Sequence, residues 1–319
     1  MKVVVTARDF SEPEIDGSYI LRDAGFEVTE CTGEYGSGTS PEQVAELIGD
    51  ADAAIVGLEP INDTIFERCP NLKLISRRGI GYDSLDLDAF RRYGAAAVRT
   101  TGTVEGAVAE HVMAYIMYFA RRLDLQSASM HRGEWKRSMT YGAKNRTLGL
   151  IGFGGIGKEI ARRADGFGMN VLYNCRHPQK AWEKEYNVHY APIEEIAQKS
   201  DYISINVPLT NETEGMIDAS FIESMKHESV LINIARSRIV DETALAKALI
   251  DGRIRGACID VYDSEPCTDS VFRSIENAVL TPHTANFTTE NIKSMNELAA
   301  ENIVKFFDGT IDDKYVIKI

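Results

Sequence analysis

Short apolar runs alternate with helix-like patterns along the whole chain. Runs of this length, separated by amphipathic segments, are typical of parallel strands covered by helices. The pattern therefore predicts an α/β fold with two doubly wound parallel sheets and argues against all-α and all-β folds. The predicted strands are 2–6, 26–30, 53–57, 72–76 and 95–98 in a first series, then 147–151, 170–174, 201–207, 229–234, 255–261 and 278–281 in a second.

The longest helical pattern covers residues 103–123. Its apolar residues recur at intervals of three and four along one face, as expected of an amphipathic helix. These residues are Val104, Val108, Val112, Tyr115 and Phe119. The polar stretch 124–146 that follows predicts a long connection, which compact domains seldom keep unless it covers a site or a partner. We expect the junction between two domains there.

Two further helices have clear boundaries. Ser40 and Pro41 predict a helix start, because serine caps a helix and proline fits its first position. Residues 288–308 predict a last helix that ends at Gly309.

Length and charge limit the classes of function. A chain of 319 residues favours two domains. The 35 Lys and Arg against 48 Asp and Glu give a formal charge of −13, which repels nucleic acids and anionic membranes. The 5 cysteines lack CxxC spacing, so neither a disulfide framework nor a metal site is expected. With no signal-peptide or membrane-spanning pattern, we expect a cytoplasmic protein.

A glycine motif follows the strand at 147–151. Gly152, Gly154 and Gly157 form GxGxxG between this strand and a helical pattern. The first glycine permits a tight turn, the second lets a pyrophosphate approach, and the third lets helix and strand pack closely. This context predicts a dinucleotide site with the anion at the helix N-terminus.

The end of the next strand bears on the choice of cofactor. Many NAD-binding proteins place an acid there to bind the adenosine ribose. Here no acid occurs between Gly166 and Trp182, and Arg176 is available to pair with a 2′-phosphate. NADP(H) is therefore favoured and NAD(H) remains possible. In the alternative, Asn174 binds the ribose of NAD and Arg176 is a solvated loop charge.

Three polar segments follow strands in the second series, at 233–238, 260–266 and 280–285. In an open parallel sheet, ligands bind beyond the carboxyl ends of the strands. Arg236, Glu265 and His283 are therefore expected to converge on one cleft.

These motifs together resemble the D-isomer-specific 2-hydroxyacid dehydrogenase family, which includes glyoxylate and hydroxypyruvate reductases, D-lactate dehydrogenases and phosphoglycerate dehydrogenases. The similarity extends over essentially the whole chain. The segments that carry it, besides the glycine motif and the three polar segments, are 78–83 (RGIGYD), 108–111 (VAEH) and 206–210 (NVPLT).

The resemblance implies that Arg236, Glu265 and His283 are catalytic. A guanidinium can hold the carboxylate and ketone of a 2-oxoacid, and a histidine can donate the proton that the product alkoxide needs. Glu265 would orient the imidazole and favour its charged form.

Further contacts are implied by the same resemblance. The substrate carboxylate would bind at a glycine turn whose N–H groups form an anion nest. This turn comprises Arg78, Gly79 and Ile80, and Arg77 is an additional candidate for a distal anion or a solvated charge. The implied cofactor contacts are Gly152, Gly154, Gly155, Ile156, Gly157, Cys175, Arg176, His177, Val207, Pro208, Thr213, Ile234, Ala235 and Asp260.

The family layout is interrupted. It implies a flavodoxin-like substrate-binding domain from residues 1–99 and 287–319, with a Rossmann cofactor domain from 100–286 inserted into it. It also implies a homodimer in which the helix from Thr103 and the segment 124–146 embrace the partner.

The favoured function is an NAD(P)H-dependent reductase of a small 2-oxoacid, with glyoxylate or hydroxypyruvate as substrate. D-3-phosphoglycerate dehydrogenase is an alternative, since Arg77 and Arg78 can bind a phosphate. Formate dehydrogenase is disfavoured, because formate oxidation gives no alkoxide for a Glu265–His283 pair to protonate. An NAD(H)-sensing corepressor is the alternative of another class, disfavoured by the acidic charge and the lack of a basic tail.

Overall fold

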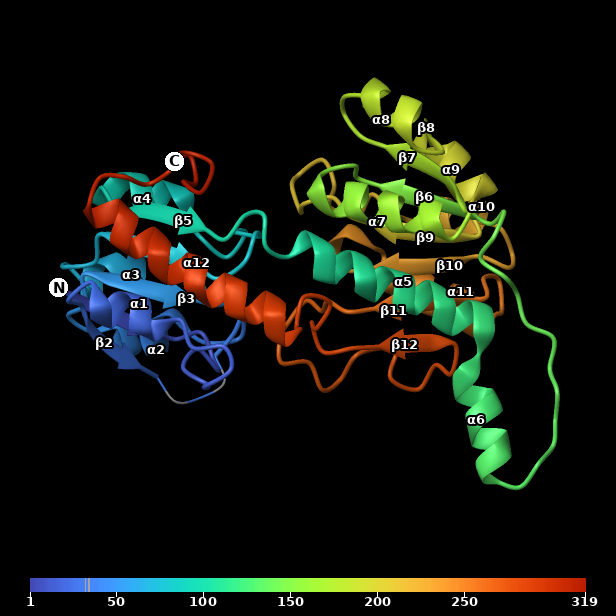
Figure 1. The fold of residues 1–319 in the computed structure, drawn as a ribbon, viewed down its shortest axis with the longest axis horizontal. Helices are drawn as coiled ribbons and strands as arrows, with labels where there is room; N and C mark the ends of the chain where they lie inside the picture. Colours follow the sequence, from blue (N-terminus) through green and yellow to red (C-terminus); the bar gives the residue numbers. More distant parts are fainter. Residues whose placement is uncertain (32, 34) are drawn as a thin grey trace. The chain divides into compact units, whose positions relative to one another are not determined.

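The computed structural model describes residues 1–31, 33 and 35–319. Its contacts divide the chain into two compact units. Unit 1 contains residues 1–104, 264–266 and 287–319, and unit 2 contains residues 105–263 and 267–286. Each unit is an open parallel sheet with helices on its faces (Figure 1). The predicted division assigned 100–104 and 264–266 to the cofactor domain, whereas their contacts belong to unit 1.

Unit 1 is built on a five-stranded parallel sheet in the order β2-β1-β3-β4-β5. This is the flavodoxin-like doubly wound order, in which the chain reverses direction between β1 and β3. The predicted strands are present within one or two residues of their expected ends. They are β1 (Lys2–Val5), β2 (Glu27–Glu30), β3 (Ala53–Val56), β4 (Leu74–Arg77) and β5 (Ala96–Arg99).

Helices cover both faces of this sheet because its strands are apolar on both sides. One face packs on α2 (Pro41–Ile48), α3 (Asp63–Arg68) and α4 (Leu87–Tyr93), and the other on α1 (Ser18–Asp23) and α12 (Thr289–Phe307). Ser40 caps α2 as expected, in a reciprocal capping box with Gln43. The helix α12 returns from the far end of the chain, and Ser76 Oγ of β4 donates a hydrogen bond to its Ala299 O at 2.9 Å.

Unit 2 is built on a seven-stranded parallel sheet in the order β12-β11-β10-β9-β6-β7-β8. Its first six strands along the chain follow the Rossmann order, with the reversal between β6 and β9. The strand β8 was not predicted, since three residues at a sheet edge are too short to show a period. The strands are β6 (Thr147–Ile151), β7 (Asn170–Asn174), β8 (Val188–Tyr190), β9 (Tyr202–Ile205), β10 (Val230–Asn233), β11 (Gly256–Ile259) and β12 (Ala278–Leu280).

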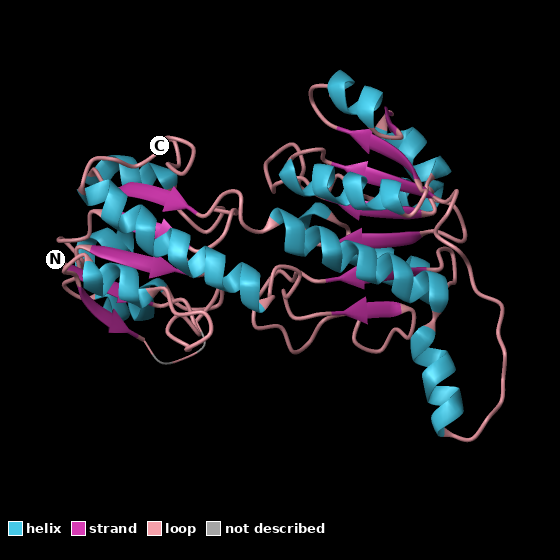
Figure 2. Cartoon of the chain, in the orientation of Figure 1, coloured by secondary structure: helices cyan, strands magenta, loops and turns pink. Residues whose placement is uncertain are grey.

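The helices of unit 2 also form two layers. On one face lie α5 (Glu105–Arg121), the long helix that the apolar spacing predicted, and α7 (Gly155–Gly166), which packs along it (Figure 2). The other face buries its apolar core under α9 (Ile193–Lys199), α10 (Ala219–Ser224) and α11 (Glu242–Ile250). The shorter elements are α8 (Lys180–Glu185) and the 3₁₀ turn η1 (Ser237–Ile239).

The segment 124–146, predicted as a polar connection and domain junction, is partly helical and lies within unit 2. The chain passes from unit 1 to unit 2 between residues 104 and 105 instead. The segment begins with α6 (Leu123–His131) and returns along an extended stretch to β6, so it forms an arm that projects from unit 2 (Figure 1). The apolar side chains of α6 are mostly exposed, and for this reason the sequence shows no amphipathic stripe there. Among the described residues, no helix has the length and apolarity needed to cross a membrane.

Candidate functional site

The glycine motif forms a tight turn between β6 and α7. Gly152 has φ +101°, and a Cβ there would lie 2.6 Å from the Asn206 carbonyl oxygen. At Gly157 a Cβ would lie 2.5 Å from the Gly152 carbonyl oxygen, so only glycine permits this helix–turn contact. Gly154 differs, because a Cβ at this position would meet no described atom within 4 Å. The middle glycine therefore faces open space.

This turn fits the pyrophosphate of a dinucleotide. Gly154 is the N-cap of α7 and has no side chain that could cap the first backbone N–H groups. Gly155 and Ile156 follow as the first helical residues, so their N–H groups point out of the helix end. The helix dipole and these donors favour an anion. The open space at Gly154 lies where the anion would approach.

The loop after β9 lines the same turn. Val207 lies against Gly152, with its Cγ1 3.0 Å from the position of a Cβ on that glycine. Thr213 Oγ1 donates to Pro208 O at 2.6 Å and accepts from Thr210 N at 2.8 Å, which folds the loop back on itself. Three of the predicted cofactor residues, Val207, Pro208 and Thr213, thus belong to one folded loop beside the glycine turn.

The end of β7 carries the residues predicted to select the cofactor. Arg176 and His177 are exposed, and Cys175 Sγ contacts His177 O at 3.1 Å. Asn174 Nδ2 donates to Ala191 O at 2.9 Å, so this amide group is engaged within the sheet edge. Burial raises the pKa of Cys175, and the nearby Lys158 ammonium acts in the opposite direction. Lys158 is therefore a second cation at this end of the sheet, which the sequence reading missed.

The segment after β10 holds Arg236 by its backbone. The buried Asn233 donates from Nδ2 to Arg236 O at 2.9 Å and accepts from Ala235 N at 3.1 Å. Ile234 and Ala235 are buried at 9% exposure, whereas Arg236 is half-buried. Its Nη1 donates to Ala235 O at 2.7 Å. Arg236 therefore leaves the sheet from a rigid turn.

Asp260 organises the loop that carries His283. Its carboxylate is fully buried and accepts hydrogen bonds from Thr281 Oγ1 at 2.5 Å, Thr284 N at 2.8 Å and Ala285 N at 3.0 Å. These donors hold the turn around His283, which has the left-handed φ of +53°. A strained non-glycine residue held by its surroundings is typical of functional sites. The predicted cofactor contact of Asp260 stays a prediction, and its observed contacts are to this loop.

Arg236, Asp260 and His283 follow neighbouring strands. In the parallel register, Asn233 of β10 pairs with Ile259 of β11, and Ile259 pairs with Leu280 of β12. The strands therefore end together, at the edge where the glycine turn also lies. Unit 2 brings Arg236 and His283 to the same sheet edge as the predicted cofactor residues.

Two residues of α5 support this edge, His111 from the segment 108–111 and Tyr115 from the apolar face of the predicted helix. Tyr115 hydrogen-bonds through its hydroxyl to Thr281 Oγ1, and burial raises the pKa of Tyr115 far above its ordinary value. His111 lies edge-on to the Tyr115 ring at 4.5 Å, and burial lowers the pKa of His111 against the opposing effect of Asp260. Sequence spacing placed both on a helix, but the contact of Tyr115 with Thr281 and the interaction of His111 with Asp260 are nonlocal.

Glu105, the first residue of α5, lies against the glycine turn. A Cβ on Gly155 would lie 2.8 Å from Glu105 Cγ. Glu105 is half-buried, and its buried Oε2 has no hydrogen-bond partner among the described residues. The sequence reading did not single it out, since nothing local connects residue 105 with 155.

Glu265 belongs to unit 1, unlike Arg236 and His283. Its backbone contacts the loop 36–39 that precedes α2. The Glu265 N–H donates to Ser37 Oγ at 3.1 Å, and Gly38 N–H donates to Glu265 O at 3.3 Å. The sequence reading found Glu265 but not the loop that holds it.

The turn after β4 differs from its expected form. The Gly79 N–H, expected to face the substrate carboxylate, donates instead to Thr100 Oγ1 at 2.8 Å. Arg77 is buried and bonds through Nη1 to Arg78 O, while Arg78 Nη1 donates to Arg8 O at 2.8 Å and Asn296 Oδ1 at 3.1 Å. Burial lowers the pKa of Arg78 to about 10. These guanidinium groups have structural partners, and Ile80 remains the candidate amide of this turn.

Unit 1 also buries a glutamate that the sequence reading missed. Glu59 follows β3, is 0% exposed, and has neither carboxylate oxygen hydrogen-bonded to a described residue. Its charge is among those that raise the pKa of Arg78 against burial, so the two groups lie near each other. Attraction to Arg78 partly offsets the cost of burying this carboxylate.

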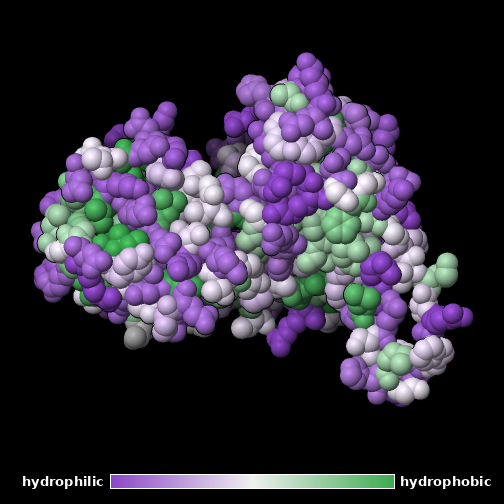
Figure 3. Space-filling model, in the orientation of Figure 1, coloured by the Kyte–Doolittle hydropathy of each residue, from purple (hydrophilic) through white to green (hydrophobic). Residues whose placement is uncertain are grey.

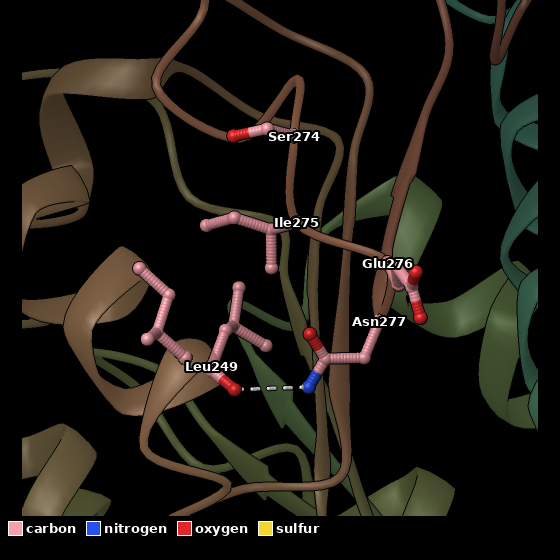
Figure 4. A pocket seen from close by; sticks show the side chains of 6 residues that line it. Leu249, Ser274, Ile275, Glu276 and Asn277 are labelled. Atoms are coloured by element: carbon pink, nitrogen blue, oxygen red, sulfur yellow. Dashed lines mark hydrogen bonds between the residues drawn. The ribbon is translucent and has the colours of Figure 1, made fainter.

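A shallow pocket lies at the opposite edge of the unit 2 sheet (Figure 4). Its lining residues lie at the end of α11 and in the turn before β12, where Asn277 Nδ2 donates to Leu249 O at 3.2 Å. This is the amino end of the strands, so the pocket contains none of the predicted residues. Among the described residues, no group of His, Cys, Asp and Glu could hold a metal ion.

Comparisons with known proteins identify the family. Residues 113–285 match the family model described as the D-isomer specific 2-hydroxyacid dehydrogenase, NAD binding domain. A glyoxylate reductase from Pyrococcus furiosus is 38% identical over 292 residues, which cover 87% of each chain.

Two solved structures are similar over the full length. One is an acyclic imino acid reductase in complex with NADPH and D-Arg, with a TM-score of 0.85, 27% identity and 100% coverage of both chains. The other is an NAD-dependent formate dehydrogenase from Staphylococcus aureus in complex with NAD, with a TM-score of 0.86, 26% identity, and coverage of 100% of this chain and 99% of that chain.

The parallel sheets, the glycine turn and the family match define an oxidoreductase with a Rossmann domain that binds NAD(P). Within that class, the chain belongs to the D-isomer-specific 2-hydroxyacid dehydrogenase family.

The glycine turn gives a prediction that separates binding from folding. Gly154→Ala adds a methyl group into open space, so we expect an unchanged melting temperature and a cofactor Kd raised by about tenfold or more, because the methyl blocks the anion. Gly157→Ala places a methyl against the Gly152 carbonyl, so we expect an unfolding free energy lower by about 1–3 kcal/mol. Thermal unfolding and cofactor titration by fluorescence measure both effects. Unchanged cofactor affinity in Gly154→Ala would contradict the proposed approach of the pyrophosphate.

Proposed function

We propose that this protein reduces a small 2-oxoacid to a D-2-hydroxyacid with NADPH or NADH, and that glyoxylate or hydroxypyruvate is the substrate. The observation that carries the proposal is the sheet edge in unit 2, where the open glycine turn, Arg236 and the braced His283 follow parallel strands. The similarity to a glyoxylate reductase supports the choice of a small 2-oxoacid.

Arg236 binds the substrate in this proposal. Its guanidinium can hold one carboxylate oxygen and the ketone oxygen together, which polarises the carbonyl and stabilises the developing alkoxide. The rigid turn at Asn233 supports this role, because a fixed backbone limits the directions that the guanidinium can take. The hydride that adds to the carbonyl carbon would come from a nicotinamide cofactor held at the glycine turn of Gly152, Gly154 and Gly157.

His283 donates the proton to the alkoxide oxygen, and in the reverse direction it accepts the proton from the hydroxyl group. The Asp260 hydrogen bonds to the backbone of Thr284 and Ala285 support this role, because they fix the turn from which the imidazole projects. Glu265 orients the imidazole and favours its charged form. The Ile80 N–H is the amide that we propose for the substrate carboxylate.

The turn after β4 bears on whether the substrate carries a phosphate group. The alternative of a phosphorylated substrate relied on Arg77 and Arg78 as free cations. Both guanidinium groups instead bond to backbone or side-chain oxygens of unit 1. We therefore favour an unphosphorylated substrate over 3-phosphoglycerate.

A spectrophotometric panel tests the function directly. The purified protein is assayed with glyoxylate, hydroxypyruvate, pyruvate, 3-phosphohydroxypyruvate and formate, each with the matching form of NADP and NAD. We expect the highest kcat/KM with glyoxylate or hydroxypyruvate. Highest activity with 3-phosphohydroxypyruvate or formate would replace the proposed substrate. Cofactor binding without turnover on any of them would favour the alternative of an NAD(H)-sensing protein.

Replacement of His283 tests the proton donor. We expect His283→Ala to lower kcat by about 10²–10⁴-fold with unchanged cofactor Kd, because the variant lacks the acid but keeps the glycine turn. Since reduction needs the protonated imidazole, wild-type reduction slows as pH rises and oxidation slows as pH falls. Both pH limits should vanish in the variant. His227→Ala is the matched control, as its side chain is 72% exposed in a loop. Full turnover in His283→Ala would remove the assignment.

We propose NADP(H) as the preferred cofactor. Arg176 is exposed at the end of β7, Lys158 lies near the neighbouring Cys175, and no acid occurs between Gly166 and Trp182. Two cations near a ribose site favour a 2′-phosphate. The Glu212 carboxylate, whose pKa is lowered first by the Thr210 hydroxyl and also by Arg176, is the opposing charge.

The choice of cofactor can be measured on one variant. Because a hydrogen bond between charged groups contributes about 1.5–3 kcal/mol, Arg176→Ala should raise the Kd of NADPH roughly 10- to 100-fold and leave that of NADH within about twofold. Arg162→Ala is the matched control, since Arg162 is an exposed arginine of α7 paired with Glu159 at 2.6 Å. Equal effects of Arg176→Ala on both cofactors would contradict the preference.

We further propose that the protein forms a homodimer and that the arm of unit 2 contacts the partner subunit. The arm carries exposed apolar side chains, visible as pale green atoms in Figure 3. A monomer gains nothing from exposing such a set, whereas a partner subunit can bury it. The residues are Leu123, Leu125, Met130, Trp135 and Met139, exposed by 66%, 55%, 54%, 82% and 100%.

Sedimentation velocity tests the dimer. The wild type should sediment as a dimer at micromolar concentration, and the double variant Trp135→Glu, Met139→Glu should dissociate at least tenfold more readily because charges replace buried apolar groups. Ile250→Glu is the control, since Ile250 is 72% exposed but lies on α11. A monomeric wild type would refute the proposal.

A further inference from the structure

A loop of unit 1 holds the backbone of Glu265 on both sides. Ser37 Oγ accepts a hydrogen bond from Glu265 N at 3.1 Å, and its hydroxyl hydrogen lies toward Glu265 O at 3.4 Å. Gly38 N–H donates to the same carbonyl at 3.3 Å. The residue is therefore fixed at its N–H and at its C=O by two neighbouring residues that are far from it in sequence.

Close approach of the two backbones requires a small residue at one position of the loop. A Cβ on Gly36 would lie 3.0 Å from Glu265 O, which is tighter than ordinary van der Waals contact. A Cβ on Gly38 would lie 3.5 Å from the same oxygen, an ordinary contact distance. Neither glycine has a positive φ, so alanine at either position suffers no backbone strain.

The loop is itself anchored to the core of unit 1. Gly36 N–H donates to Thr39 Oγ1 at 3.0 Å, and Thr39 N–H donates to Gly36 O at 3.0 Å, so the loop closes into a turn. Ser40 then caps α2, whose Val44 is fully buried. The position of Ser37 is thus set by a helix that packs on the sheet.

A pocket borders the side of Glu265 that faces this loop. A cavity of about 410 Å³ lies there, lined by Tyr35, Gly38, Thr39 and Gln43 together with Ser264, Glu265 and Pro266. Of the described residues that line it, Tyr35 is the titratable group besides Glu265. The backbone contacts with Ser37 and Gly38 fix the point from which the Glu265 side chain projects.

We propose that Ser37 is a positioning residue for the reaction, which acts through the backbone of Glu265 and does not touch the substrate. The proposal rests on the proposed function, in which Glu265 orients the imidazole of His283 and favours its charged form. When Ser37 is lost, the carboxylate samples more directions and favours the charged imidazole less. Reduction then becomes slower. As the pH is raised, its rate also begins to fall at a lower pH than in the wild type.

The test compares Ser37→Ala with Ser37→Thr. For Ser37→Ala we expect about a fivefold lower kcat, as for the loss of one net hydrogen bond, and a high-pH limit of reduction at least about half a pH unit lower. Cofactor Kd and melting temperature should not change. Ser37→Thr keeps the hydroxyl on an exposed position and should restore both kcat and the pH profile.

The two glycines supply a matched pair. Gly36→Ala should shift the pH profile in the same direction as Ser37→Ala, because its methyl displaces the Glu265 carbonyl. Gly38→Ala adds the same methyl at an ordinary distance and should leave the profile unchanged. A wild-type profile in Ser37→Ala overturns the proposal. A uniform loss of kcat at every pH with a lower melting temperature also overturns it, since that result indicates a structural role.

Glu265→Gln separates this proposal from the proposed function. If Glu265→Gln has the same pH profile as the wild type, the proposed role of Glu265 itself is wrong. If Glu265→Gln shifts the profile but Ser37→Ala does not, only the role of Ser37 is wrong. If both are right, adding Ser37→Ala to Glu265→Gln should produce no further shift, because the two changes act on one group.

Discussion

The buried carboxylate of Asp260 is the interaction on which the end of the unit 2 sheet depends. A charge with no exposure to water must be compensated by hydrogen bonds. Thr281, Thr284 and Ala285 provide three donors within 3.0 Å. Each hydrogen bond to a charged group contributes about 1.5–3 kcal/mol, whereas a left-handed non-glycine residue costs about 1–3 kcal/mol. The three bonds together outweigh the strain at His283, so the unusual backbone there is stable.

The same edge depends on a steric constraint at the glycine turn. Gly152 and Gly157 lack room for a side chain because the chain itself approaches them, whereas Gly154 has room that the protein does not use. The space at Gly154 lies at the N-terminus of α7, where an anion can approach the free backbone N–H groups. The difference between the three sites is what relates the local fold to the binding of a dinucleotide.

Local signals in the sequence predicted most of the fold. Continuous apolar runs located all strands except β8, and the apolar spacing located α5, because both depend on residues close in sequence. The helix α6 was missed because its apolar residues are exposed and show no period relative to a core. In the site, the glycine motif could be predicted from the sequence, because the role of each glycine is determined by residues within the turn.

Contacts between distant residues could not be read in this way. The sequence suggested a free amide at Gly79, but Thr100 from the neighbouring strand end accepts its hydrogen bond. It also showed Glu265 and Tyr115 without their partners Ser37 and Thr281, which are far away along the chain. A residue type that suits a reaction can be recognised in a sequence, whereas the groups that hold it appear only in the fold.

The charge around the site likewise depends on contacts between residues that are distant in sequence. The chain has a net charge of −13, so an anionic substrate and cofactor need positive groups at the place where they bind. Arg77 and Arg78 bond to oxygens of unit 1, so their donors are partly used within the protein. Cations that follow strands at the carboxyl edge of unit 2 include Arg236 and Arg176. Lys158 of α7 lies near Cys175 at the same edge, where the positive end of the α7 dipole also lies. Attraction of an anion by this acidic protein therefore depends on a few positive groups at one sheet edge, and the net charge of the chain does not describe that edge.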